Sequence, residues 1–145
     1  MPEVSPQLGI SQTLSLAQAD ILTLNSEPFI VIPGASGFVN VFQSAMVNYR
    51  YKTAIFTNID NLLSFKIVPT MGDPVVVSNS LGAENFLGIE QSTTLTFVPA
   101  NPYTALFDSM DNAPLVFTIG DSDPIGGSVD SVVSIIITYA IFQLS

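Results

Sequence analysis

The sequence predicts an all-β protein: a β-sandwich of jelly-roll or Greek-key type, with about eight strands and an extended N-terminal arm. Apolar and polar residues alternate over long stretches, which is typical of strands buried on one face. Turns rich in Pro, Gly, Asn and Asp separate these stretches, and none of them shows the apolar spacing of a long amphipathic helix. Several connections are too long for tight hairpins, which favours strands that cross between two sheets.

Residues 1–16 differ from the rest and are predicted to form the arm, with the sandwich domain spanning residues 17–145. Pro2, Pro6 and Gly9 interrupt this stretch, and its apolar residues are isolated. A disordered terminus and an arm lying along a neighbouring subunit both fit this pattern. In the second case the neighbour would be contacted by Val4, Leu8, Ile10, Leu14 and Leu16. In either case we expect deletion of residues 1–16 to leave a folded domain.

In the first half of the domain, short strands are predicted at residues 19–24 and 29–32, closed by turns at 25–28 and 33–37. The next predicted strand, residues 38–52, alternates between apolar odd positions such as Val47 and polar even positions such as Asn48. Phe38, Phe42 and Met46 interrupt this alternation on its polar side. Because so long a strand is often bulged, we expect a break near its middle.

In the second half, residues 62–68 alternate cleanly, and residues 75–77 form a short strand after the turn at 69–74. Residues 86–90 and 93–98 are predicted as two strands or as one bulged strand. The last strands are predicted at 115–119 and 129–142. The connection at 99–113 is expected to hold one helical turn near residues 104–110.

The charge pattern excludes several classes of partner. Twelve Asp and Glu against three Lys and Arg give a net charge of −9, and the three cations are Arg50, Lys52 and Lys66. Such a chain cannot neutralise a phosphate backbone and is repelled by anionic lipid, so we expect neither nucleic-acid nor membrane binding. The N-terminus has no signal-peptide pattern, and the most apolar stretch, residues 132–142, is too short to span a bilayer.

The chain lacks Cys, His and Trp, so it can form no disulfide, thiol nucleophile or Ser-His-Asp triad. Paired carboxylates could still support a glycosidase, but most of the acids stand beside Pro, Gly, Ser or Asn, where they usually shape turns. We therefore expect no enzyme and no cofactor. The acids of the 121–130 loop are weak candidates for a calcium site, although their spacing does not match an EF-hand: Asp121, Asp123 and Asp130.

Only 10% of the residues are charged, against about 25% in an ordinary soluble domain. A chain of this size exposes roughly 7,000 Å² when folded, and its few charged side chains cover little of that area. We therefore expect other protein to cover part of the surface, as in an obligate oligomer. Further interface candidates are Tyr49, Arg50, Tyr51 and Tyr103, since tyrosine and arginine are enriched in interfaces.

Two stretches of the chain resemble small virion proteins of tailed bacteriophages. One is the run from Ile21 to Pro33, followed by Gly34-Ala-Ser-Gly37 and the long strand, and the other is the Gly-rich turn and last strand from Gly126 to Phe142. Proteins of this kind include head decoration, or cement, proteins with jelly-roll-like folds. The resemblance implies a homotrimer that binds the major capsid protein on the outer surface of the virion and stabilises the head.

Two other functions fit the composition. A receptor- or carbohydrate-binding β-sandwich of a phage fibre or tail would expose a groove lined by polar and aromatic side chains. A glycosidase-type enzyme would need two carboxylates at a suitable distance.

Overall fold

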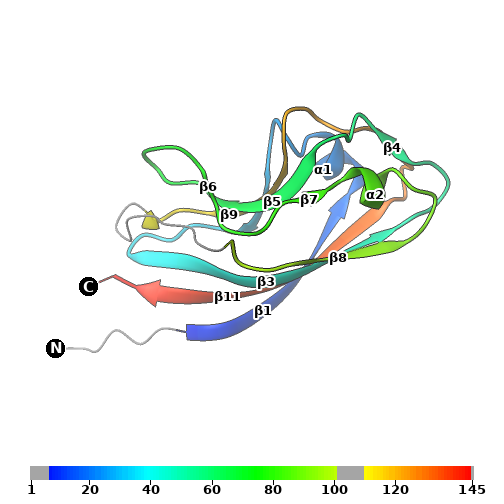
Figure 1. Cartoon of the computed structure of the whole chain (residues 1–145). Coiled ribbons are helices and arrows are strands. Elements are labelled where there is room, and N and C mark those ends of the chain that lie inside the picture. Colours follow the sequence, from blue (N-terminus) through cyan, green and yellow to red (C-terminus); the bar gives the residue numbers. More distant parts are fainter. Residues whose placement is uncertain (1–6, 101–109, 145) are drawn as a thin grey trace.

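Two antiparallel sheets pack against each other in the computed structural model, which describes residues 7–100 and 110–144 (Figure 1). Sheet A contains, in spatial order, β1 (Gln7–Ala17), β11 (Val132–Gln143), β3 (Phe38–Arg50) and β8 (Thr93–Phe97). Sheet B contains β2 (Phe29–Ile32), β9 (Leu115–Ile119), β5 (Leu62–Ile67) and β6 (Val75–Val76), and β7 (Leu81–Gly82) also pairs with β5. The remaining described elements are the paired strands β4 (Phe56–Thr57) and β10 (Ile125–Gly126) and the helices α1 (Gln18–Leu22) and α2 (Glu84–Leu87).

The strand order is that of a jelly roll. When the strands are numbered along the chain without the short strands β4, β7 and β10, sheet A has the order 1-8-3-6 and sheet B the order 2-7-4-5. The chain therefore crosses between the sheets at most of its connections, as the long loops predicted. The predicted all-β sandwich is confirmed.

An aromatic cluster fills the space between the sheets. The Phe65 ring of β5 lies 4.9–5.2 Å from the rings of its neighbours in β9, β3 and β8, measured between centroids: Phe117, Phe42 and Phe97. All four rings are almost fully buried. At the other end of the core, the Tyr49 ring lies 6.0 Å from Phe56 and 5.8 Å from Phe86. These contacts account for most of the phenylalanines seen at strand positions in the sequence.

The expected break in the long strand lies at Gln43. Opposite β11, Thr138 pairs with Ser44, but the next residue, Tyr139, pairs with Phe42, so Gln43 is an extra residue in β3. This bulge reverses the side-chain alternation. It turns Phe42 into the core, 2% exposed, and leaves Met46 on the outer face, 43% exposed. The bulge therefore explains why Phe42, an apolar residue at an even position, faces the core, whereas Met46 stays on the outer face with the polar residues of even number.

Two predicted strands are wrong, because their residues form short helices. Residues 19–24 belong mostly to α1, where the Asp20 carboxylate accepts a hydrogen bond from the Ala17 N–H at 2.9 Å and caps the first turn. Residues 86–90 begin in α2, which buries Phe86 and Leu87. Six-residue apolar runs fit a buried helical turn as well as a strand. Neither helix in the described part of the chain has the length and apolar character that crossing a membrane requires.

The structure also differs from the predicted arm. Residues 7–17 form β1, an edge strand that pairs with β11 along most of its length, and Leu16 is completely buried in the core. The sandwich therefore includes residues 7–17, and deletion of residues 1–16 would remove a strand instead of leaving the domain intact. The last strand starts at Val132, three residues later than predicted, because residues 128–131 form a turn closed by the Ser131 N–H and the Ser128 carbonyl.

Candidate functional site

The outer side of sheet A is an open and nearly uncharged surface. The strand register places polar and apolar side chains in rows across four strands. We call the following set the sheet A face: Ser11, Thr13, Ser15 and Ala17 of β1, Val132, Ser134, Ile136 and Thr138 of β11, Ser44, Met46, Asn48 and Arg50 of β3, and Thr94 and Thr96 of β8. Arg50 is the only charged member of this set.

Large apolar side chains lie in the middle of the sheet A face. Ile136 and Met46 pair across β11 and β3 and are 41% and 43% exposed, and Val132 is 38% exposed. Hydroxyl and amide groups surround them and bond across the strands, Ser11 to Thr138 at 3.1 Å between the two Oγ atoms and Thr94 Oγ1 to Asn48 Oδ1 at 2.6 Å. An apolar centre with a neutral polar border is the composition of a protein-binding surface.

The acidic residues are kept away from this face. In residues 7–100 and 110–144, every Asp and Glu lies in a loop or a short helix and none lies in a strand. Carboxylates are poor strand formers and good turn residues, which explains the distribution locally. As a result, the carboxylates of the described residues are concentrated at the connections between strands, and the sheet A face carries none of them.

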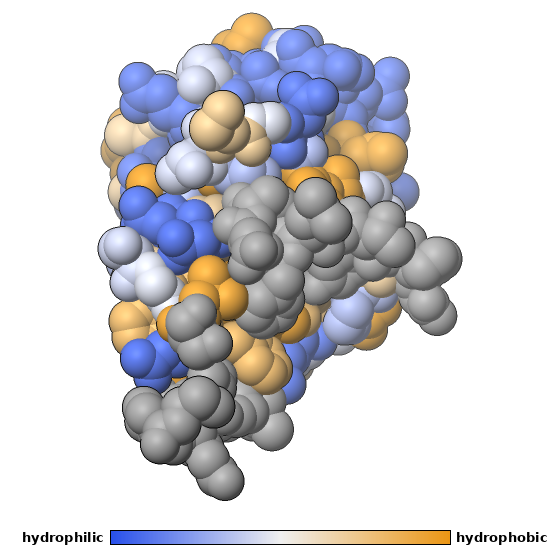
Figure 2. Space-filling view, turned by 90° about the vertical axis from the view of Figure 1, so that its left-hand side faces the viewer, coloured by the Kyte–Doolittle hydropathy of each residue, from blue (hydrophilic) through white to orange (hydrophobic). Residues whose placement is uncertain are grey.

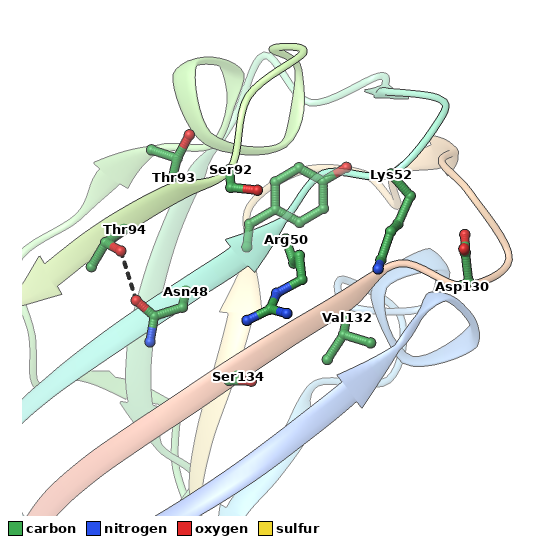
Figure 3. A pocket seen from close by; sticks show the side chains of 10 residues that line it. Asn48, Arg50, Lys52, Ser92, Thr93, Thr94, Asp130, Val132 and Ser134 are labelled. Atoms are coloured by element: carbon green, nitrogen blue, oxygen red, sulfur yellow. Dashed lines mark hydrogen bonds between the residues drawn. The ribbon is translucent and has the colours of Figure 1, made fainter.

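A hollow of about 520 Å³ lies at one end of the sheet A face, and we call it the Arg50 hollow (Figure 3). The end of β3 and the residues after it contribute Asn48, Tyr49, Arg50 and Lys52. The start of β8 and the residue before it contribute Ser92, Thr93 and Thr94. The start of β11 and the turn before it contribute Asp130, Val132 and Ser134. Figure 3 shows the Arg50 guanidinium between Asn48 and Val132, with Lys52 and Asp130 on one side.

Two of the three cations of the chain therefore meet in this hollow. Arg50 and Lys52 are both exposed, and within the described residues neither side chain forms an ion pair or a hydrogen bond. Ser92 accepts the Tyr51 N–H at 3.2 Å through Oγ, which leaves its hydroxyl proton free to be donated. The hollow combines unpaired positive charge with neutral hydrogen-bonding groups.

A second hollow, of about 380 Å³, lies where β11 ends and β3 begins. Two of its polar side chains bond within the chain: the Asn40 amide donates to the Pro33 carbonyl at 3.1 Å, and Gln12 Nε2 donates to the Tyr139 hydroxyl at 3.2 Å. Figure 2 shows this end of the molecule, where hydrophobic residues form separate areas among hydrophilic ones. A third hollow, of about 390 Å³, is lined by two carboxylates, Asp60 and Glu84.

The predicted partner-binding residues fall into three groups. Leu16 and Tyr49 are 0% and 1% exposed, so the prediction is wrong for them, because the chain itself covers both side chains. Ile10, Leu14 and Tyr51 are half-buried, and Arg50 is exposed on the sheet A face. Val4 and Tyr103 lie outside the described residues, and of Leu8 only the place in β1 is described.

The three calcium candidates, Asp121, Asp123 and Asp130, have different surroundings in the structure. The Asp123 carboxylate holds the turn after α1: Oδ1 accepts the Asn25 and Ser26 N–H groups at 2.8 and 2.9 Å, and Oδ2 accepts the Ser26 hydroxyl at 2.7 Å. These hydrogen bonds lower the pKa of Asp123, the Ser26 backbone bond having the largest effect. Asp121 is exposed, and Asp130 lines the Arg50 hollow. In the described residues no three acidic side chains group in a way that could hold a metal.

Reasoning from the sequence missed most of the sheet A face and most of the Arg50 hollow. One feature of the sequence pointed to this site. Asn48, Arg50 and Lys52 are alternate residues of the long predicted strand, so they share its polar face. The contributions of β8 and β11 depend on strand pairings more than forty residues apart, which the local pattern does not encode. The chain matches no protein-family model and no curated protein.

Proposed function

We propose that this chain is a structural virion protein without catalytic activity: a decoration protein that binds the outer surface of a phage head as a homotrimer. The observation that carries the proposal is the sheet A face, a four-stranded surface with an apolar centre and without a carboxylate. The major capsid protein and a second copy of the chain are the partners that this surface would contact.

Charge favours contact through this face. Copies that each carry −9 repel one another, and an interface that brings acidic loops together adds a local cost. Contact through the sheet A face avoids that cost, because the acids of residues 7–100 and 110–144 lie in loops and short helices. Removing neutral hydroxyl and amide groups from water also costs less free energy than removing charged groups.

The face supplies the centre of an interface of standard size. It runs along β11 from Val132 to Thr138, which at about 3.3 Å per residue spans roughly 23 Å, and four strands about 4.8 Å apart span roughly 19 Å. The face therefore covers roughly 440 Å², a little over half of the roughly 800 Å² that each partner buries in a standard interface, so the contact would extend beyond this set of residues. Jelly rolls occur in viral capsid proteins and in lectins, so the fold is compatible with the proposal without deciding it.

The first test is the mass of the purified protein in solution, by light scattering or sedimentation. We expect a trimer, and we expect Met46→Lys to weaken association at least about tenfold because it buries an unpaired charge at the centre of the face. Met71→Lys is the matched control, since Met71 is 84% exposed in a turn away from the face. Equal behaviour of the two variants, or a monomer at high concentration, would contradict the proposal.

The second test is cosedimentation with empty phage heads. The wild-type protein and Met71→Lys should pellet with the heads and should raise the temperature at which the heads disassemble. Met46→Lys should do neither. If the protein trimerises but ignores the heads, it is an assembly protein of another part of the virion.

A second candidate function is a receptor- or carbohydrate-binding sandwich of a fibre or tail. The Arg50 hollow favours it, because its lining is mostly hydroxyl and amide groups. Binding of the isolated protein to a glycan array, without binding to heads, would support this function over the first.

A further inference from the structure

We propose that the Arg50 hollow binds a saccharide that carries a carboxylate, with Arg50 and Lys52 holding the carboxylate and the neutral side chains holding the ring hydroxyls. This inference rests on the second candidate function and specifies its ligand. The hollow shares five residues with the sheet A face, so a partner that covered the whole face would also cover the hollow: Asn48, Arg50, Thr94, Val132 and Ser134. Met46, the residue that tests association, lies outside the hollow, so the two proposals can be tested separately.

The placement of the cations indicates an anionic ligand. The chain has three cations among twelve acids, and two of the three line one hollow. In the described residues none of the three, Lys66 included, has an ion-pair partner, so the hollow is distinguished by the two cations that it brings together and not by their lack of partners. Arg50 presents a planar fork of donors, which matches the two oxygens of a carboxylate.

The rest of the lining indicates a sugar as the carrier of that carboxylate. Hydroxyl and amide groups from three different segments of sequence face the same space, among them Asn48, Ser92, Thr94 and Ser134 (Figure 3). Ser92 keeps a proton to donate. The Asn48 carbonyl oxygen is engaged by Thr94, which turns the Asn48 amide group into a donor with a fixed orientation. Val132 supplies the one apolar patch against which a ring face could lie.

The position of Asp130 restricts the charge that the ligand can carry. Its carboxylate lines the same hollow, so the site has two positive charges and one negative charge. A dianionic phosphate or a polyanion would meet repulsion from Asp130 and from the net charge of −9. A monoanionic sugar has one carboxylate for Arg50 and Lys52, and its hydroxyls can donate to Asp130. A cavity of about 520 Å³ lies within the usual range for small-ligand sites.

The experiment is an NMR or calorimetric titration of the full chain with glucuronic acid and N-acetylneuraminic acid. Glucose, sodium acetate and an acidic tripeptide serve as comparison ligands. We expect at least one of the two acidic sugars to bind, and each comparison ligand to bind about tenfold more weakly or not at all. Arg50→Gln should weaken binding about tenfold or more.

Lys66→Gln is the matched control for Arg50→Gln. It removes the third cation and changes the net charge by the same amount, but Lys66 lies in β5 of sheet B, outside the hollow. Lys52→Gln provides a second variant within the hollow, and a melting curve of each variant verifies its fold. Equal affinity of Arg50→Gln and Lys66→Gln would overturn the inference, and so would equal binding of glucose or of the tripeptide. Binding of neutral glycans alone would overturn it while leaving carbohydrate binding in place.

Discussion

Two central strands of the sandwich, β9 in sheet B and β11 in sheet A, differ in how far their outer faces are covered. All five residues of β9 are buried, on both faces of the sheet. β11 buries Val133, Ile135 and Ile137 towards the core, while Val132 and Ile136 are exposed between them. The chain therefore covers the middle of sheet B by itself and leaves sheet A open. The difference identifies sheet A as the side on which another molecule can lie.

The largest expected effect is at the shared core of both sheets. Phe65→Ala should reduce the free energy of unfolding by about 4 kcal/mol, because it removes a ring packed against three others and leaves a cavity. Ile136→Ala, on the open side of β11, should cost less than about 1 kcal/mol in the monomer. Urea unfolding of both variants measures the difference. A comparable loss for Ile136→Ala at concentrations where the protein is a monomer would mean that the chain itself covers the outer side of sheet A.

A smaller effect is expected from one substitution made on both central strands. The Thr118 hydroxyl of β9 is buried and donates to the Leu24 carbonyl at 3.1 Å, so Thr118→Val should cost about 1–2 kcal/mol by leaving that carbonyl unpaired. Thr138 of β11 bonds to Ser11 at a solvent-accessible position, so Thr138→Val should cost less than about 0.5 kcal/mol. Thermal unfolding at one pH compares the two, and equal costs would remove the distinction between the strands.

The smallest effect concerns the inner side of sheet A. The Tyr49 hydroxyl is buried and has no hydrogen bond of good geometry in the described residues, although the Ser131 side chain lies close to it. Burial raises the pKa of Tyr49, and Ser131 offsets this only in part. The folded state therefore holds this proton more tightly than the unfolded state does, so the stability is complete below about pH 10 and falls as the pH rises further.

Tyr49→Phe should consequently be as stable as the wild type at pH 7, within about 1 kcal/mol, and should lose less stability above pH 10. Tyr51→Phe is the control, since Tyr51 is only half-buried. Urea midpoints at pH 7 and pH 11 provide the measurement. The same alkaline loss in both variants would exclude Tyr49 as its source.

Strands with a strong local pattern were predicted well. The predicted strands at 29–32 and 115–119 coincide with β2 and β9, and the break expected in the long strand lies at the Gln43 bulge. The errors lie where the pattern is short or sparse. Residues 19–24 form a helical turn because Asp20 caps it, and residues 7–17 form an edge strand because β11 offers them a partner.

The candidate site was predicted only where one strand carries it. Arg50 was singled out in advance, because it belongs to the long strand and is one of three cations. Ser92, Thr94 and Asp130 join it through the pairing of β3 with β8 and with β11, which brings distant parts of the chain together. Tyr49 was misplaced for the same reason, since the core into which it packs consists of residues from both sheets.

The amino-acid sequence by itself determined that the chain is all-β, that its negative charge lies in the turns, and that most of its surface is neutral. These properties follow from residue type and from the two-residue period of a strand, which are local. Only the tertiary structure decided which side of which sheet is left open and that Arg50 and Lys52 share a hollow with hydroxyl groups. Those outcomes depend on the jelly-roll crossings, which pair strands that are distant in sequence, and no local pattern records such pairings.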